Sequence, residues 1–309
     1  MKLLFLSVLT FVLISTSALS LQRINNKYLN SERNSVVVQI RTNNYTTETF
    51  AKLPTLSSSS TFPVLSAQAV VATDLDSGVA LYEKEPDKPL LPASTTKIVT
   101  ALVAMDYYSP NEVLRVGNIK SEGQRMRLVV GEEITVDSLL RGLLIASAND
   151  AAEVLAQNYP GGKEMFISVM NEKASELNLD NTNFANPSGL DAVGHVSTAR
   201  DLIRVSAHAM ENPYFSEIVG TEKTLVESVD ERFAHKLVNI NELLGKIDGV
   251  LGVKTGWTEE ARENLITYVE RGGHRVMIAV LGSQDRFGET EELIEWIFDN
   301  YEWQDVNYP

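Results

Sequence analysis

A run of apolar residues after Pro92 constrains this chain more than any other feature. Residues 98–105 read Ile-Val-Thr-Ala-Leu-Val-Ala-Met, which are good helix material and are apolar on nearly every side. A helix of this kind has no polar face to offer to water, so it must lie inside a core. A proline just ahead of such a run is typical of a helix start. The sequence therefore predicts a buried helix over residues 94–107, with the rest of the chain supplying the layers that cover it.

Ser94 and Lys97 fall in the first turn of this helix, three residues apart and therefore on one face. Burial disfavours the ammonium form of a lysine and lowers its pKa, and a neutral lysine can take a proton from a neighbouring serine. The unpaired N–H groups of the same helix start are donors that could hold a developing oxyanion. The pair fits a serine nucleophile with its own base. In the alternative interpretation, Ser94 only caps the helix and Lys97 extends to solvent.

Two further strings favour the catalytic interpretation. Ser147-Ala148-Asn149 follows an apolar helical run, and Lys254-Thr255-Gly256 comes late in the chain. Ser-x-x-Lys, Ser-x-Asn and Lys-Thr-Gly in this order are the signature of class A β-lactamases and penicillin-binding proteins. Each string is common alone, and the ordered set is specific. We therefore expect the three to form one site.

Each residue of the set has an expected role in that site. Ser147 can relay a proton between the two lysines and a leaving amine, and Asn149 can hold a substrate amide. Lys254 and Thr255 supply a charge and a hydroxyl for an anionic substrate end such as a terminal carboxylate. Gly256 lets the strand approach a ligand closely. The N–H groups of Ser94 and Trp257 would form the oxyanion pair.

Composition excludes several other classes of function. The net charge is −14 and the pI is about 4.8, which argues against nucleic acid as a partner. The absence of cysteine excludes disulfides and thiolate metal sites. The four histidines have no ligand spacing, so we expect neither a metal nor another cofactor and interpret them as surface or packing residues: His195, His208, His235 and His274.

The N-terminal residues predict export. Met1-Lys2 is followed by an uncharged apolar stretch over residues 3–19 and by small residues suited to cleavage after Ser20. The same stretch is long enough to remain as a membrane anchor, so residues 1–20 are either a signal peptide or an N-terminal anchor. Residues 21–62 are rich in Asn, Ser and Thr and predict a disordered linker or stalk. Residues 63–309 are expected to form the folded domain.

The order of elements in that domain predicts an α+β fold. Strand patterns occur near both ends of the domain, with mainly helical sequence between them. This order predicts one antiparallel sheet built from both chain ends, flanked by helices and carrying a mainly helical insertion. The expected strands are 67–73, 79–82, 250–257, 264–269 and 275–281, and the expected helices are 94–107, 136–145, 150–157, 161–177, 198–210 and 289–301.

Over residues 63–303 the chain resembles the serine-type D-alanyl-D-alanine carboxypeptidases, the low-molecular-mass penicillin-binding proteins of peptidase family S11. Further similar segments include Val71-Ala72-Thr73-Asp74, Asn186-Pro187-Ser188-Gly189-Leu190-Asp191 and Gly252-Val253-Lys254-Thr255-Gly256-Trp257-Thr258. The resemblance implies a β-lactamase/transpeptidase-like fold and a hydrolase of peptidoglycan biosynthesis located in the cell envelope, periplasmic or extracellular. Ser94 would attack the bond between two D-alanines of a stem peptide, and β-lactams would acylate the same residue.

The chain also departs from the family pattern. Many members carry a β-rich domain and an amphipathic anchor after the catalytic part, whereas residues 257–309 are barely enough to finish the sheet. Trp257 stands where some members have histidine, which would change the shape of the pocket. Arg286 is a candidate for the arginine that helps hold the substrate carboxylate in some members. Arg200, at a helix start, is expected to be structural and to brace the loop before it.

Three other functions compete with a carboxypeptidase. A peptidoglycan D,D-endopeptidase of the same superfamily shares all three motifs and ranks second. A β-lactamase ranks third, because residues 177–186 contain Asp180 but no glutamate to activate the deacylating water. A non-catalytic β-lactam sensor or wall-binding protein ranks last, because the region before residue 63 is too short and polar for a signalling domain.

Overall fold

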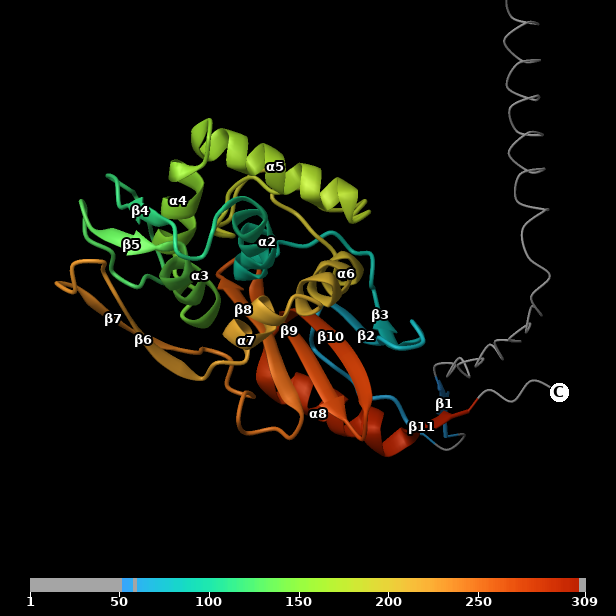
Figure 1. The fold of residues 1–309 in the computed structure, drawn as a ribbon. Coiled ribbons are helices and arrows are strands. Elements are labelled where there is room, and N and C mark those ends of the chain that lie inside the picture. The colour runs from blue at the N-terminus through green and yellow to red at the C-terminus, as the bar shows by residue number, and fades with distance from the viewer. Residues whose placement is uncertain (1–51, 58–59, 306–309) are drawn as a thin grey trace, which may run out of the picture. The chain divides into compact units, whose positions relative to one another are not determined.

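The computed structural model describes residues 52–57 and 60–305, which belong to one compact unit. A five-stranded antiparallel sheet runs through it in the order β3-β2-β10-β9-β8 (Figure 1). Two strands come from the first third of the chain and three from its last part. Their bounds are Ala69–Asp74 (β2), Ala80–Lys84 (β3), Val250–Thr258 (β8), Arg262–Arg271 (β9) and His274–Ser283 (β10). The prediction of a sheet built from both chain ends is confirmed.

Strand β10 shows why both faces of this sheet are covered. Met277, Ala279 and Leu281 belong to one hydrophobic core, and the alternating residues Val276, Ile278 and Val280 belong to a second. Successive side chains of a strand point to opposite faces, so a run that is apolar at every position must have a layer on each side. Helix α8 (Arg286–Asn300) covers one face, and α2 (Lys97–Tyr107) and α6 (Ala199–Met210) lie on the other (Figure 1).

Helix α2 is the centre of the helical layer, as its sequence predicts. Residues 97–104 are all buried, and α2 contacts α3, α4, α5 and α6. The surrounding helices span Val136–Ile145 (α3), Asn149–Asn158 (α4) and Gly162–Glu176 (α5). The helix start differs in one respect: Ala93–Thr96 form a separate 3₁₀ turn, η1, before α2 begins. Ser94 and Lys97 nevertheless stay on one face, because three residues make one turn of a 3₁₀ helix.

Two helices begin with a threonine cap. The Thr135 side chain accepts a hydrogen bond from the Ser138 N–H at 3.2 Å, and the Thr198 side chain accepts from the Asp201 N–H at 3.1 Å. Each threonine satisfies an N–H group that has no partner inside its helix. These caps fix the starts of α3 and α6 and therefore the positions where the chain enters the helical layer.

Several short elements between α2 and β8 were not predicted. Val113–Arg115 (β4) pairs with Glu133–Thr135 (β5), and Lys223–Glu227 (β6) pairs with Ala234–Val238 (β7). Helix α7 spans Pro213–Val219. Strands of three residues show no alternation to detect, and the hairpin β6–β7 buries residues on one side only. The hairpin lies beside α3 (Figure 1).

The folded domain begins before residue 63, the first residue predicted for it. Leu53–Leu56 (β1), inside the segment predicted to be a linker, pairs with Tyr301–Gln304 (β11). Further hydrogen bonds hold the chain after β1, from Trp296 Nε1 to the Thr61 carbonyl at 2.7 Å and from Tyr82 Oη to the Pro63 carbonyl at 3.1 Å. Aromatic side chains of α8 and β3 provide these two bonds, which composition alone does not indicate. The rest of the predicted signal and linker lies outside the described residues.

None of the helices within residues 52–57 and 60–305 has the length and apolar character needed to cross a bilayer.

Candidate active site

Ser94 and Lys97 are in direct contact. Lys97 Nζ donates a hydrogen bond to Ser94 Oγ at 2.8 Å and a second one to the Ser188 carbonyl. The turn η1 places both residues on the same side, and Ser188 belongs to the loop between α5 and α6. The alternative in which Lys97 extends to solvent is excluded, because the residue is 0% exposed.

Burial determines the electrostatics of Lys97. Removal from water lowers the pKa of Lys97 well below its usual value, and the positive charge of Lys254 lowers this pKa further. The carboxylates of Asp150 and Glu153 oppose the shift without cancelling it. A lysine of this kind can carry a neutral amine in a folded protein, and a neutral amine beside a hydroxyl can act as a base.

A second lysine–serine pair lies next to the first. Lys254 Nζ, on β8, donates to Ser147 Oγ at 2.9 Å and to the Thr255 carbonyl at 3.1 Å. Burial lowers the pKa of Lys254 to about 7, and the nearby Arg286 guanidinium contributes to this shift. Ser147 lies between α3 and α4 with φ at +56°, a left-handed conformation that a residue with a side chain seldom adopts. This conformation is part of the connection that aims Ser147 at Lys254.

Strand β8 passes very close to η1. A Cβ atom added at Gly256 would lie 3.1 Å from Ser94 N, 3.1 Å from the Pro92 carbonyl oxygen and 3.1 Å from Ala93 Cβ. Gly189 is closer still, because its Cβ would lie 2.0 Å from the Ala93 carbonyl oxygen. Only glycine fits at Gly189, and at Gly256 a side chain would fit only if η1 moved by a few tenths of an ångström. Strand β8 thus brings Lys254-Thr255-Gly256 beside the turn that carries Ser94.

Asn264 fixes this contact and was not found from the sequence. Its Nδ2 donates to the carbonyls of Leu91 and Pro92 at 2.9 and 3.1 Å, and its Oδ1 accepts from the Gly282 N–H at 2.8 Å. Asn264 is fully buried on β9, directly opposite Gly256 in the strand register. One amide therefore ties the segment before Ser94 to two strands of the sheet. An asparagine inside a strand-like sequence carries no signal of this role.

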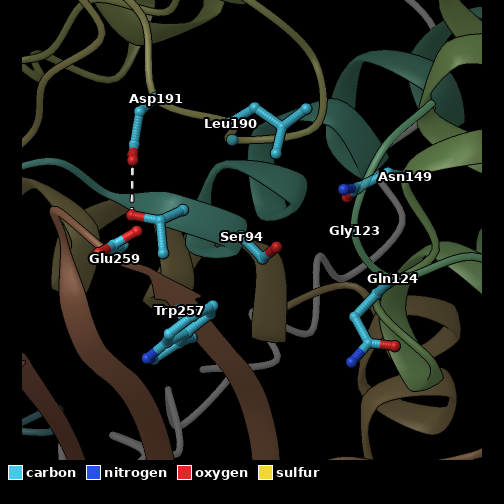
Figure 2. Close-up of a pocket in the computed structure, with 10 residues that line it drawn as sticks. Ser94, Gly123, Gln124, Asn149, Leu190, Asp191, Trp257 and Glu259 are labelled. Carbon is cyan, nitrogen blue, oxygen red and sulfur yellow. Dashed lines mark hydrogen bonds between the residues drawn. The ribbon is translucent and has the colours of Figure 1, made fainter. Parts of the chain in front are cut away.

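Ser94 opens onto a cleft of about 370 Å³ (Figure 2). Asn149, Gly123 and Gln124 line one side, and Trp257 lines the other, where its side chain is 61% exposed. Leu190, Asp191, Thr258 and Glu259 complete the lining. Thr258 Oγ1 donates to Asp191 Oδ1 at 2.8 Å and so connects β8 to the loop that carries Leu190. Lys97, Ser147, Lys254 and Thr255 are buried behind this surface.

Asn149 presents an unused acceptor at the cleft. Its Nδ2 donates to the Glu122 carbonyl at 2.7 Å, which fixes the orientation of the amide. Its Oδ1 is buried and has no hydrogen-bond partner among the described residues. A buried acceptor without a partner is costly unless a ligand supplies a donor. A substrate N–H group would satisfy it.

Arg286 lies close to Lys254 and Gly256 but is not among the residues that line the cleft. Its Nη1 donates to the Gly256 carbonyl at 3.0 Å, and its guanidinium lies 4.7 Å from the centre of the Phe287 ring. Arg200 does not brace the loop before its own helix. Its guanidinium instead pairs with Asp87 at 2.7 Å and Glu83 at 2.9 Å, and so ties α6 to β3 and the segment after it.

His195 is a buried packing residue that braces η1. Its Nδ1 accepts from the Ala185 N–H at 2.9 Å, so in the neutral ring the proton is on Nε2, which donates to Thr96 Oγ1 at 2.9 Å. Burial and the Lys97 charge lower the pKa of His195 to about 4, which keeps the ring neutral. Among the residues that the structure describes, no three His, Asp or Glu side chains are grouped so that they could hold a metal.

The chain is similar to a known family of peptidases. Residues 56–285 match the model of the peptidase family S11, described as D-alanyl-D-alanine carboxypeptidase. This chain belongs to that family. Among curated members, it is 35% identical to the carboxypeptidase DacF of Bacillus subtilis over 76% of this chain and 63% of the relative. It is also 35% identical to DacB2 of Mycobacterium tuberculosis over 75% of this chain and 82% of the relative.

Other members of the family carry different names. The chain is 30% identical to a D-alanyl-D-alanine endopeptidase of Escherichia coli, over 76% of this chain and 78% of the relative. Among solved structures, the DD-transpeptidase of Streptomyces K15 superposes with a TM-score of 0.74 at 30% identity and covers 78% of this chain and 100% of its own. The predicted family and its β-lactamase/transpeptidase-like fold are thus confirmed. The chain spans slightly under two thirds of the length of the Bacillus relative.

Proposed function

We propose that this protein is a serine-type D-Ala-D-Ala carboxypeptidase that removes the terminal D-alanine from peptidoglycan stem peptides. The contact that carries the proposal is the 2.8 Å hydrogen bond between Ser94 Oγ and the fully buried Lys97 Nζ in a chain of this family. Neutral Lys97 accepts the hydroxyl proton as Ser94 Oγ attacks the carbonyl carbon of the penultimate D-alanine. The N–H groups of Ser94 and Trp257 stabilise the oxyanion that forms.

Collapse of this intermediate expels D-alanine and leaves an ester on Ser94. The departing amine needs a proton, and Ser147, whose Oγ accepts a hydrogen bond from Lys254 Nζ at 2.9 Å, would deliver it. Water then hydrolyses the ester, giving the shortened stem peptide and free Ser94. A β-lactam carries a strained amide that Ser94 would open in the same way, so penicillins are expected to acylate it.

The remaining cleft residues would position the substrate. The terminal carboxylate would bind Lys254 and Thr255, with Arg286 adding positive charge at that end. Asn149 Oδ1 would accept a substrate N–H, and Trp257 would cover the apolar part of the stem peptide. Gly256 provides the close approach of β8. No cofactor or metal takes part in this scheme.

A D,D-endopeptidase is the second candidate, because relatives named D-alanyl-D-alanine endopeptidase match at 34% and 30% identity. The two activities differ only in the group that leaves: a single D-alanine or a second stem peptide. A substrate comparison decides between them.

We further propose that the chain is exported to the cell envelope and is held at a distance from the membrane. Lys2 and the uncharged apolar stretch over 3–19 support export, and the polar sequence from residue 21 to β1 supports a tether. Whether residues 1–20 are cleaved or anchor the protein can be measured by N-terminal mass spectrometry of the native protein. An intact Met1 in the membrane fraction would identify an anchor.

The test of the activity is intact-protein mass spectrometry after exposure to penicillin, with the Ser94→Ala variant as control. We expect one adduct that maps to Ser94 and is missing in the variant, together with D-alanine release from a pentapeptide by the unmodified enzyme. Adduct formation or full activity in Ser94→Ala would overturn the serine mechanism. No adduct and no D-alanine release would favour a non-catalytic wall-binding protein.

A further inference from the structure

A second cavity of about 540 Å³ lies beside the active-site cleft. Four cationic residues line it, and we name it the basic pocket after them: Arg125, Arg127, Arg232 and Lys236. The strand β7 and the loop before β5 form its walls, and Ala146, at the end of α3, completes them. A concentration of positive charge is unexpected in a chain whose net charge is −14.

Most of these charges are free to bind an anion. Arg232 pairs with Asp230 at 2.6 Å, but within residues 52–57 and 60–305 the other three cations have no acidic partner. Glu132 and Asp150, two carboxylates near the pocket, are already engaged. Glu132 contacts His235 Nε2 at 2.7 Å, and Asp150 accepts hydrogen bonds from three backbone N–H groups of residues 126–128.

The same contacts hold the backbone of the loop that carries Arg125 and Arg127. His235 Nδ1 donates to the Met126 carbonyl at 2.9 Å, and this bond connects β7 to the loop before β5. Arg127 has φ at +68°, a left-handed conformation that the Asp150 hydrogen bonds hold in place. A binding site whose backbone is already fixed loses little entropy when a ligand arrives.

The position of the basic pocket assigns it to one side of the cleft. Gly123 and Gln124 line the cleft, and the next residues, Arg125 and Arg127, line the pocket. On the other wall Ala146 is bonded to Ser147, which contacts Lys254. Trp257 lies on the other side of the cleft from Gln124 (Figure 2). The pocket therefore continues the side of the cleft next to Ser147, the residue that would pass a proton to the leaving amine.

We propose that the basic pocket is a subsite for carboxylates of the leaving strand of a cross-linked peptidoglycan peptide. A single leaving D-alanine has only one carboxylate, which Lys254 and Thr255 would hold. A leaving stem peptide carries further carboxylates, and these match three free cations in a preformed cavity. Cleavage transfers the acyl group to Ser94 and a proton to the leaving amine, and water then releases the acyl group. The inference rests on the proposed function and extends it to a larger substrate.

The test compares two substrates and two triple variants. The pocket variant is Arg125→Gln, Arg127→Gln and Lys236→Gln. The control variant, Lys52→Gln, Lys88→Gln and Lys246→Gln, removes equal charge at surface sites where the cations contact Asp305, Gln68 and Glu242. Mass spectrometry measures kcat/KM for D-alanine release from a pentapeptide and for cleavage of a cross-linked peptide dimer. The ratio of dimer to pentapeptide rates should fall about tenfold in the pocket variant and stay within twofold in the control.

A second experiment changes the substrate in place of the protein and so does not depend on how the variants fold. A dimer whose leaving-strand carboxylates are amidated should be cleaved by the unmodified enzyme about as slowly as the acidic dimer is cleaved by the pocket variant. Raising salt from 0.05 to 0.5 M should slow cleavage of the acidic dimer only.

The outcomes separate this inference from the proposed function. D-alanine release without dimer cleavage, or equal ratios in all three proteins, would overturn the subsite and leave the carboxypeptidase standing. If no D-alanine is released, the proposed function fails. Calorimetry of Ser94→Ala with the acidic and amidated dimers then tests the subsite alone, and equal affinities would overturn it.

Discussion

Gly256 and Ser94 are so close that a Cβ at Gly256 would lie 3.1 Å from Ser94 N. The same atom would lie 3.1 Å from the Pro92 carbonyl oxygen, so it would press against η1 along its backbone. Lys254, Thr255 and Gly256 of β8 therefore contribute to the site in different ways. Two positions supply functional groups, and the third supplies the absence of a side chain, which lets a strand lie against the start of a helix.

Gly256→Ala is expected to impair the site more than the fold. The added methyl group would displace η1 by a few tenths of an ångström and move the Ser94 N–H away from the developing oxyanion. Loss of one such donor slows catalysis by about 100-fold. Stopped-flow acylation by a chromogenic β-lactam measures this rate, and Gly117→Ala is the matched control, because its Cβ would meet only the Gln157 side chain at 3.4 Å. Equal rates in both variants would mean that the close contact is not required.

The main layers of the fold and the three motifs could be predicted because their signals are local. An all-apolar run near Ile98 predicts burial, and a serine and a lysine one turn apart predict a contact. The contacts between motifs follow from a sheet closed by both chain ends. The roles of Ser94 as nucleophile, Lys97 as base and Lys254 as carboxylate-binding residue remain predictions.

The contacts that were missed join residues far apart in the sequence. Asn264 bonds to carbonyls at positions 91 and 92, and His195 bonds to Thr96. An isolated polar residue in an apolar strand has no period and no motif, so its partners emerge only when the strands are placed. The strand β1 was missed for the same reason. Its pairing depends on β11, at the far end of the chain.

Asn264→Ala is expected to lower both stability and activity. It removes donors to two carbonyls and the acceptor for the Gly282 N–H, all in a buried place. Leaving such groups unsatisfied costs about 2–4 kcal/mol of unfolding free energy. Because the segment before Ser94 loses its attachment to the sheet, kcat should fall more than KM rises.

Urea denaturation and steady-state kinetics measure the two effects of Asn264→Ala. Asn158→Ala, in which a helix-end side chain loses bonds to carbonyls of its own helix and of β4, is the control. A variant as stable and active as the unmodified enzyme would show that η1 is positioned by β8 alone.

The pH dependence of substrate binding should depend on Lys254. Its pKa of about 7 means that the ammonium form predominates below pH 7 and is lost as the pH rises. If that charge holds the substrate carboxylate, kcat/KM should decline above about pH 7, because kcat/KM reports the free enzyme. The decline in kcat should begin at higher pH than the decline in kcat/KM, since a bound carboxylate favours the charged lysine.

Arg286→Gln tests whether Lys254 causes the decline of kcat/KM at alkaline pH. The Arg286 charge helps to lower the pKa of Lys254, so its removal should raise this pKa and move the alkaline limb of kcat/KM to higher pH. The position of the limb is independent of any loss of affinity that the variant also suffers. A limb that stays in place would assign the titration to another group.

Lys97→Arg should abolish acylation while the fold is retained. Burial lowers the pKa of Lys97 well below its usual value, which favours the neutral amine that a base requires, whereas an arginine stays charged in proteins. Intact-protein mass spectrometry should find no penicillin adduct, and circular dichroism reports folding. A buried guanidinium could unfold the protein, so Lys97→Met, which keeps most of the volume and carries no base, is measured beside it. Both variants should lack the adduct. Acylation of a folded variant at the normal rate would place the base elsewhere, and Lys254, which contacts Ser147, would be the next residue to substitute.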